Sequence, residues 1–447
     1  MRKHRTTNHS VDKRKVERVR SLPTTSVSQD VLYEIMESKS NKATHDIYKF
    51  PTKFIPEVPR WALNMFSKGK NFVIMDPFCG SGTTLVESCL IEKFSVGIDI
   101  NPFCQLLSKV KTTPLDSRQL EEVDFLYKEI IKRLKHGKTI SETSVPNLPN
   151  IDHWFEKKTI NDLAIIRDSI TEFELRTSSR ELADFLRICL AGIVRKVSLA
   201  DDQSPKPYVS KRFPKKPPPV IEEFVKTYKR AIDSVREFSK KVSKHYCFVA
   251  RDGDARKPLT KSVQAFMEEN RNEGFDLMVT SPPYINAYDL VRTFKLELFW
   301  LDLIRAKEIR NLKEQHIGTE EIKSVLYKKG VPHLGSRDID EILERIYEVD
   351  QKRAYVVWKF FLDMKENLKQ AFDLILPGGH YLIVIGDSVI RGNRIPTSRM
   401  LSDLGSDVGF EEVKHLSYII KNHYLRIPRG GRGGKIKIDQ ISLLRKP

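Results

Sequence analysis

Short apolar runs alternate with amphipathic stretches along much of this 447-residue chain. The run at 72–75 suits a buried parallel strand; a helical segment follows at 85–93 and a second apolar run at 95–98, which together predict a βαβ unit. Apolar runs at 275–279 and 381–385 continue the pattern after a long interval. Strands that alternate with helices predict an α/β fold, which is a doubly wound sheet of the Rossmann-like type.

The middle of the chain has helical periodicity instead. Asp116 and Gln119 have the spacing of a capping box, and apolar residues follow them at helical intervals. We therefore divide the chain into a flexible basic arm, an α/β domain in two segments and a mainly helical insertion. The boundaries are 1–30 for the arm, 31–111 and 245–447 for the α/β domain, and 112–244 for the insertion. The last strands, 418–420 and 441–444, could form a closing antiparallel pair.

Charge indicates the kind of partner. Lys and Arg number 77 against 59 acidic residues, a net charge of +18, which attracts polyanions. Solubility alone could explain the excess, but the basic residues cluster at 2–20, 206–216 and 426–437. Candidate DNA contacts are therefore Lys206, Lys211, Arg212, Lys215, Lys216, Arg426, Arg429, Arg432 and Lys435.

Other classes of protein are disfavoured by what the composition lacks. No apolar run is long enough to cross a bilayer, so no membrane partner is expected. The five cysteines have neither CxxC pairing nor metal-ligand spacing, which predicts no metal and fits a reducing, cytoplasmic location.

A glycine-rich turn, Asp-Pro-Phe-Cys-Gly-Ser-Gly-Thr-Thr at 76–84, follows the first strand of the βαβ unit. Gly80 and Gly82 allow a tight turn against a ligand, and Asp99 ends the next strand, where a carboxylate can accept from ribose hydroxyls. This arrangement predicts a nucleoside-containing ligand without distinguishing a nicotinamide cofactor from S-adenosylmethionine. Leu85 stands where the third glycine of a dinucleotide fingerprint would be, which disfavours a dehydrogenase.

The segment Thr-Ser-Pro-Pro-Tyr at 280–284 follows another buried strand. The Ser281 hydroxyl and the Pro282 carbonyl can accept from an amino group, Pro283 stiffens the turn, and Tyr284 offers a face on which a base can stack. Two acceptors on an exocyclic amine would direct its lone pair at a methyl group held in line. A rigid turn that packs an aromatic ring is the alternative interpretation.

Together, DPFCGSGTT and TSPPY resemble motifs I and IV of the DNA amino-methyltransferases, which make N6-methyladenine or N4-methylcytosine. The segment His-Asp-Ile-Tyr-Lys-Phe-Pro-Thr-Lys-Phe-Ile-Pro at 45–56 is similar to motif X, Asp99 to the motif II acid, and Asp254 to the motif III residue near the adenine. The resemblance implies S-adenosylmethionine as cofactor. The residues it places at the cofactor are Tyr48, Lys53, Phe54, Pro56, Asp76, Pro77, Phe78, Gly80, Ser81, Gly82, Thr83, Asp99, Ile100, Asn101, Asp254 and Ala255.

In that family, Ser before Pro-Pro-Tyr mostly accompanies cytosine N4, so Ser281 favours N4-methylcytosine in double-stranded DNA over N6-methyladenine. C5 methylation is disfavoured because the chain has no Pro-Cys dipeptide. The resemblance also suggests restriction–modification and a cognate endonuclease. The bulk of the chain outside the motifs lies at 112–244 and 301–376, and either region could read the DNA sequence, with 112–244 as the possible recognition region and the α/β segments as the methyltransferase catalytic domain. An RNA amino-methyltransferase and an inactive DNA-binding module remain alternatives, and the oligomeric state is left open.

Overall fold

The computed structural model describes residues 14–24, 31–36, 43–51, 54–69, 71–137, 144–202, 204–285, 289–421 and 436–447. The strands in this part of the chain are β1 (Lys15–Val19), β2 (Val31–Ile35), β3 (Val73–Asp76), β4 (Phe94–Gly97), β5 (Cys247–Val249), β6 (Phe275–Thr280), β7 (Ile375–Ile385), β8 (Ser388–Ile390), β9 (Asn393–Ile395), β10 (Glu411–Ile419) and β11 (Ile438–Arg445). None of the described helices is long and apolar enough to span a bilayer.

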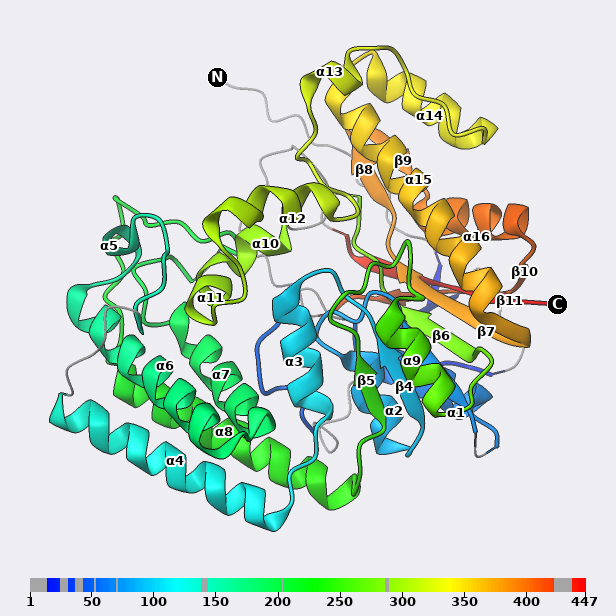
Figure 1. Ribbon diagram of the computed structural model, residues 1–447. Helices are drawn as coiled ribbons and strands as arrows, with labels where there is room; N and C mark the ends of the chain where they lie inside the picture. Colours follow the sequence, from blue (N-terminus) through cyan, green and yellow to red (C-terminus); the bar gives the residue numbers. More distant parts are fainter. Residues whose placement is uncertain are drawn as a thin grey trace.

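Helices surround the sheet and form a second body beside it (Figure 1). They are α1 (Glu57–Phe66), α2 (Thr83–Leu90), α3 (Pro102–Thr112), α4 (Ser117–His136), α5 (Ile151–Trp154), α6 (Lys157–Thr177), α7 (Arg180–Val194), α8 (Val220–Lys241), α9 (Lys261–Glu269), α10 (Leu290–Thr293), α11 (Lys295–Trp300), the 3-10 turn η2 (Ala306–Glu308), α12 (Ile309–Gln315), α13 (Ser324–Tyr327), α14 (Arg337–Tyr347), α15 (Gln351–Leu374) and α16 (Thr397–Val408).

The main sheet has the described strand order β1-β2-β10-β11-β7-β6-β3-β4-β5. Strands β7, β6, β3, β4 and β5 are parallel, whereas β11 is antiparallel to both β7 and β10. The β10–β11 pairing confirms the expected antiparallel pair at the end of the chain. Crossovers between parallel strands carry helices onto both faces, so the predicted α/β class with a doubly wound sheet is confirmed.

Side chains of β3 point alternately to the two faces, as expected for a strand buried on both sides. Val73 and Met75 pack with the layer that contains α9, α14, α15 and α16. Ile74 packs with α1 on the opposite face, where Trp61 of that helix is buried. The strand ends therefore lie between two packed layers, and only the loops that follow them reach the surface.

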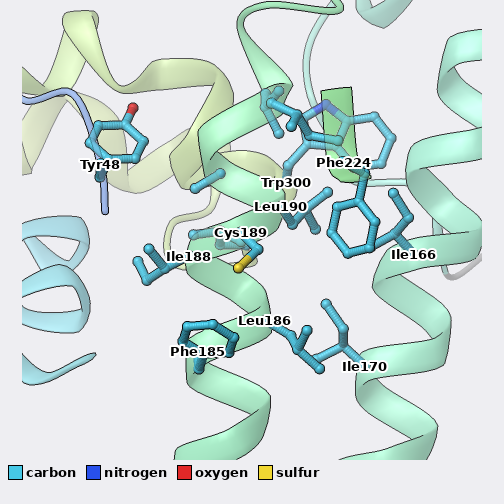
Figure 2. Close-up of a cluster of buried hydrophobic side chains, with 14 of the residues drawn as sticks. Tyr48, Ile166, Ile170, Phe185, Leu186, Ile188, Cys189, Leu190, Phe224 and Trp300 are labelled. Carbon is cyan, nitrogen blue, oxygen red and sulfur yellow. The ribbon is translucent and has the colours of Figure 1, made fainter. Parts of the chain in front are cut away.

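Helices α4 to α8 form a bundle that we call the helical unit. Its core is apolar and continuous, with Leu186 of α7 facing Ile170 of α6 and with Phe224 of α8 beside Ile166 of α6 (Figure 2). α3 contacts α7 and lies between the helical unit and the sheet (Figure 1). The helical periodicity of 112–244 thus predicted the helices, while their attachment through α3 is a tertiary feature.

Two expectations about chain segments need correction. The arm expected at 1–30 is not flexible throughout, because Lys15–Val19 forms β1 and pairs in parallel with β2 at the edge of the main sheet. The three charged residues of Lys-Val-Glu-Arg-Val suit an exposed edge strand, and this excess of charge concealed the strand in the sequence. Strand β7 also begins at Ile375, ahead of the apolar run expected at 381–385, with a register irregularity between Phe275 and Leu277 of β6.

A buried ionic cluster joins the segment before α1 to α2. The Glu87 carboxylate accepts from Arg60 Nε at 2.8 Å and lies 2.8 Å from His45 Nε2, and Glu87 is 2% exposed. Burial raises the pKa of Glu87, but the hydrogen bonds from His45 and Arg60 outweigh that effect and hold the pKa below its ordinary value. His45 is therefore a structural residue of the core.

Glu87→Gln should destabilise the protein by about 3–5 kcal/mol, because it leaves the buried partners without their counter-charge. Urea unfolding at pH 7 would measure the loss. Glu237→Gln, which breaks the exposed pair of Glu237 with Lys241 on α8, is the control and should cost at most about 0.5 kcal/mol. Equal losses in the two variants would contradict a structural role for the buried cluster.

Candidate active site at the carboxyl ends of the strands

The glycine-rich turn connects β3 to α2 in a shape that only glycine accepts easily. Gly80 and Gly82 have φ values of +49° and +75°. A Cβ on Gly82 would lie 3.0 Å from Ser108 Oγ and 3.1 Å from Ser108 Cα, so α3 packs directly on the turn. Ser108 Oγ donates to the Gly80 carbonyl at 2.9 Å, and Lys111 Nζ donates to the Ser81 carbonyl at 2.7 Å. The turn is held from below by α3, which leaves its other side for a ligand.

Asp99 closes this turn from the neighbouring strand. Its two carboxylate oxygens accept from Gly80 N–H at 3.0 Å and from Asn101 N–H at 2.8 Å. Burial raises the pKa of Asp99 above its ordinary value, while the Asn101 hydrogen bond and the nearby His316 act in the opposite direction. Asp99 is only half-buried, so it can still accept from hydroxyl groups of a ligand at the end of β4.

Asp76 joins the glycine-rich turn to the Thr-Ser-Pro-Pro-Tyr loop. Its Oδ1 accepts from Phe78 N–H at 3.1 Å and from Thr280 Oγ1 at 2.6 Å. Asp76 is 1% exposed, and burial raises its pKa to about 7 despite these hydrogen bonds. Asp76 lies beneath both loops, and its hydrogen bonds are to residues at the base of each loop.

The loop after β6 presents Ser281 and Pro283 half-buried, while Pro282 is buried. Tyr284 donates its hydroxyl to Asp439 Oδ1 at 2.6 Å, and Tyr418 donates to the other oxygen of the same carboxylate at 3.0 Å. Burial raises the pKa of Asp439 to about 6, although both hydrogen bonds favour the ionised form. Asp439 therefore fixes the position of the Tyr284 ring from a strand at the far end of the chain.

The segment around Asp254 lies against the end of β4. A Cβ on Gly253 would come within 2.3 Å of Ile98 Cγ2, which brings this segment close to Asp99. Asp254 is paired with Arg256 at 2.6 Å, and the Ala255 carbonyl accepts from Asn367 Nδ2 at 2.7 Å. The three predicted elements, around 80, 99 and 254, thus meet at one edge of the sheet.

The motif X-like segment divides between this edge and the core. Tyr48 is 8% exposed, its hydroxyl donates to Glu297 Oε1 at 3.0 Å, and its ring packs edge-on to Phe103. Phe54 and Pro56 lie at the start of α1, where Phe54 packs on the core beneath the sheet. Lys53 lies outside the described residues.

The other residues expected at a cofactor take their positions from these turns. Pro77, Phe78, Ser81 and Thr83 belong to the glycine-rich turn or to the first turn of α2, and Ile100 and Asn101 follow Asp99. Asn101 caps α3, where its side chain accepts from Phe103 N–H at 3.0 Å. We retain their cofactor contacts as predictions.

One of the expected DNA contacts is turned inward. Lys215 Nζ donates to the Arg195 and Ala200 carbonyls and lies 2.8 Å from the Asp202 carboxylate, with 15% of its side chain exposed. The prediction that Lys215 contacts DNA is therefore wrong, because its charge is used within the loop. Lys206, Lys211, Arg212 and Lys216 are exposed or half-exposed. Arg426, Arg429, Arg432 and Lys435 lie outside the described residues.

Sequence reasoning missed three polar residues near the site. Asp439 is a charged residue in the inward phase of β11, and that alternation was the available signal. Glu297 is 1% exposed, and burial raises its pKa to about 7. His316 Nδ1 donates to the Leu312 carbonyl at 2.7 Å, while its buried Nε2 has no hydrogen-bond partner among the described residues.

The chain is similar in sequence to known DNA methylases and methyltransferases. A family model described as DNA methylase matches residues 2–109. The chain is 27% identical over 394 residues to the Type II methyltransferase M.MvaI of Kocuria varians, covering 83% of this chain and 82% of that protein. It is 25% identical to the Type II methyltransferase M.BsoBI of Geobacillus stearothermophilus, covering 85% of this chain and 81% of that protein.

A solved structure of a putative DNA modification methylase from Thermus thermophilus, complexed with S-adenosyl-L-methionine, is 19% identical. The match covers 39% of this chain and 48% of that one, with a TM-score of 0.19. This TM-score is too low to bear on the fold.

Asp439→Asn should change the pH dependence of stability. A folded pKa of about 6 against an unfolded value of about 3.9 means that the wild-type carboxyl group favours folding most when protonated. Relative to the variant, the wild type should lose about 3 kcal/mol of unfolding free energy as the pH rises from about 4 to about 7. Denaturant unfolding at several pH values measures this difference. Asp233→Asn on the exposed face of α8 should run parallel to the wild type, and a parallel Asp439→Asn curve would refute the assignment.

Proposed function

Because the chain belongs to the DNA amino-methyltransferase family, we propose that it methylates the exocyclic N4 of cytosine at specific sites in double-stranded DNA. S-adenosylmethionine is the cofactor, and when bound it supplies the electrophilic methyl group. The proposal rests on the 2.6 Å hydrogen bond between Thr280 and Asp76. This bond holds the glycine-rich turn (76–84) and the Thr-Ser-Pro-Pro-Tyr loop (280–284) side by side at adjacent strand ends.

The residues at the strand ends fit this cofactor. Gly80 and Gly82 keep the turn free of side chains on the ligand side, and backbone N–H groups at the start of α2 suit a carboxylate. Asp99 would accept from the ribose hydroxyls. His316 adds a buried ring nitrogen near Asp99 that has no hydrogen-bond partner among the described residues, which is the kind of group that a polar ligand satisfies.

Ser281, Pro282, Pro283 and Tyr284 would then act on the acceptor base. The Ser281 hydroxyl and the Pro282 carbonyl accept from the two N–H bonds of the amine, and the lone pair is thereby directed at the methyl group. Tyr284, fixed through Asp439, stacks on the base after the base has left the duplex. Pro283 limits the motion of the loop.

Cytosine N4 is proposed over adenine N6 because Ser281 occupies the position before Pro-Pro-Tyr. Restriction–modification is the proposed setting, since both long relatives are named Type II methyltransferases. A cognate endonuclease would then cleave the same DNA sequence wherever this protein has left it unmethylated. The helical unit is the proposed DNA-recognition region, and the α/β segments around it are the proposed catalytic domain.

Incubation with isotopically labelled S-adenosylmethionine and unmethylated genomic DNA should yield labelled N4-methylcytosine after digestion and mass spectrometry. Total RNA is the parallel substrate and should remain unlabelled. Labelled N6-methyladenine would retain the enzyme class and reject the inference from Ser281. Label in RNA alone would reject DNA as the substrate.

Asp99→Ala should weaken S-adenosylmethionine binding about 30- to 150-fold, since it removes a charged acceptor of about 2–3 kcal/mol. Isothermal titration calorimetry gives the dissociation constant directly. Asp233→Ala on α8 is the control and should leave it unchanged. Because Asp99 also accepts from the turn, an unfolding curve of each variant must accompany the titration. Unchanged affinity in a folded Asp99→Ala protein would remove Asp99 from the cofactor site.

A further inference from the structure

The loop between α7 and α8, residues 204–219, combines exposed cations with exposed aromatic rings. It contains five Lys or Arg residues, six prolines and no acidic residue. Phe213 is 71% exposed and Tyr208 is 42% exposed, which is unusual for rings of this size. The Arg212 guanidinium lies 5.2 Å from the centre of the Phe213 ring. An aromatic ring within a positive surface suits a polyanion that carries flat bases.

The base of this loop is pinned to the helical unit. Arg195, at the end of α7, donates to the Asp201 and Pro205 carbonyls, each at 3.0 Å. Lys215 returns the chain to the same place by donating to the Arg195 carbonyl at 3.0 Å and to the Ala200 carbonyl at 3.2 Å. Phe213 is therefore presented to solvent by a loop whose two ends are fixed, and its N–H donates to Ser210 Oγ at 3.0 Å within the tip.

The segment at 318–320 relates the 204–219 loop to the Thr-Ser-Pro-Pro-Tyr loop at 280–284. Burial alone would raise the pKa of Glu320, but the Arg353 hydrogen bond and the nearby charges of Arg353 and Lys206 hold it below its ordinary value. Glu320 follows closely after Gly318, which has a φ of +78°. A Cβ on Gly318 would lie 3.1 Å from the Tyr284 carbonyl oxygen. The Tyr284 carbonyl thus borders the segment at 318–320, and the charge of Lys206 acts on Glu320 in that segment.

We propose that the 204–219 loop enters the DNA beside the base to be methylated and that Phe213 is an aromatic wedge in the base stack. The proposal rests on the proposed function, and it adds a residue that assists removal of the target base from the duplex. Lys211, Arg212 and Lys216 contact the phosphates on either side of the inserted ring. Apolar wedges of this kind unstack neighbouring bases, and the loss of stacking is what makes a base easier to flip.

Phe213→Ala tests the wedge, with Val349→Ala as the matched control because Val349 is a 66% exposed apolar residue between α14 and α15, outside the helical unit. The substrate is a duplex with the methylation site identified by the labelling assay. Phe213→Ala should lower kcat/KM on this duplex about tenfold, near the value of one base–aromatic contact. Phe213→Trp should restore activity, and Val349→Ala should leave it unchanged.

A mismatched duplex separates a wedge from a structural role. When the target base has no pairing partner, less unstacking energy is required, so the defect of Phe213→Ala should shrink to about threefold or less. With 2-aminopurine at the target position, the fluorescence rise on binding should be smaller for Phe213→Ala than for the wild type. An equal defect on matched and mismatched duplexes would overturn the wedge.

Replacing Lys211, Arg212 and Lys216 together with Ala tests the phosphate contacts. The slope of log affinity against log salt concentration should decrease by about 0.9 for each cation removed from a phosphate, whereas Lys369→Ala on the exposed side of α15, outside the helical unit, should leave the slope unchanged. If the wild-type protein methylates DNA and every loop variant behaves like the wild type, the proposed role of the loop is rejected and the proposed function is retained. Wild-type protein that methylates no DNA would reject the proposed function itself.

Discussion

The buried carboxylate of Asp76 is the constraint on which the arrangement of the site depends. It ends β3, accepts from the turn that follows it and accepts from Thr280 at the end of the neighbouring β6. A carboxyl group that is 1% exposed is costly to bury, and each of these hydrogen bonds offsets part of that cost. The two loops are therefore coupled, because displacement of either one removes a hydrogen bond from the buried Oδ1. This coupling fixes the positions of the glycine-rich turn and the Thr-Ser-Pro-Pro-Tyr loop relative to each other.

The second support comes from elements far away in the sequence. α3 packs against the glycine-rich turn through Ser108 and Lys111, and it connects the turn to the helical unit through its contact with α7. On the other side, Asp439 of β11 holds Tyr284 from a strand 155 residues further along. The site is therefore braced by the helical unit and by the closing strand pair, and its loops need little stiffness of their own.

Buried acids with raised pKa values surround the site. Burial raises the pKa of Asp76 and of Glu297 to about 7 and that of Asp439 to about 6. Each lies near a residue that the proposed function uses: Asp76 below both loops, Glu297 against Tyr48 and Asp439 against Tyr284. Protonation of these acids near neutral pH lets them donate as well as accept, and the hydrogen-bonding pattern of the site is then sensitive to pH.

The sequence by itself determined the α/β class, the helices of 112–244 and the two motifs, because hydrophobic periodicity and short glycine or proline turns are local properties of the chain. The sequence also predicted that Gly80, Gly82 and Asp99 lie close together, since successive parallel strands end at the same edge of a sheet. Only the tertiary structure decided that Lys15–Val19 is an edge strand, that Lys215 is an internal donor and that Asp439 holds Tyr284. Each of these depends on which distant segment lies opposite, and a residue's own neighbours in the sequence carry no record of that partner.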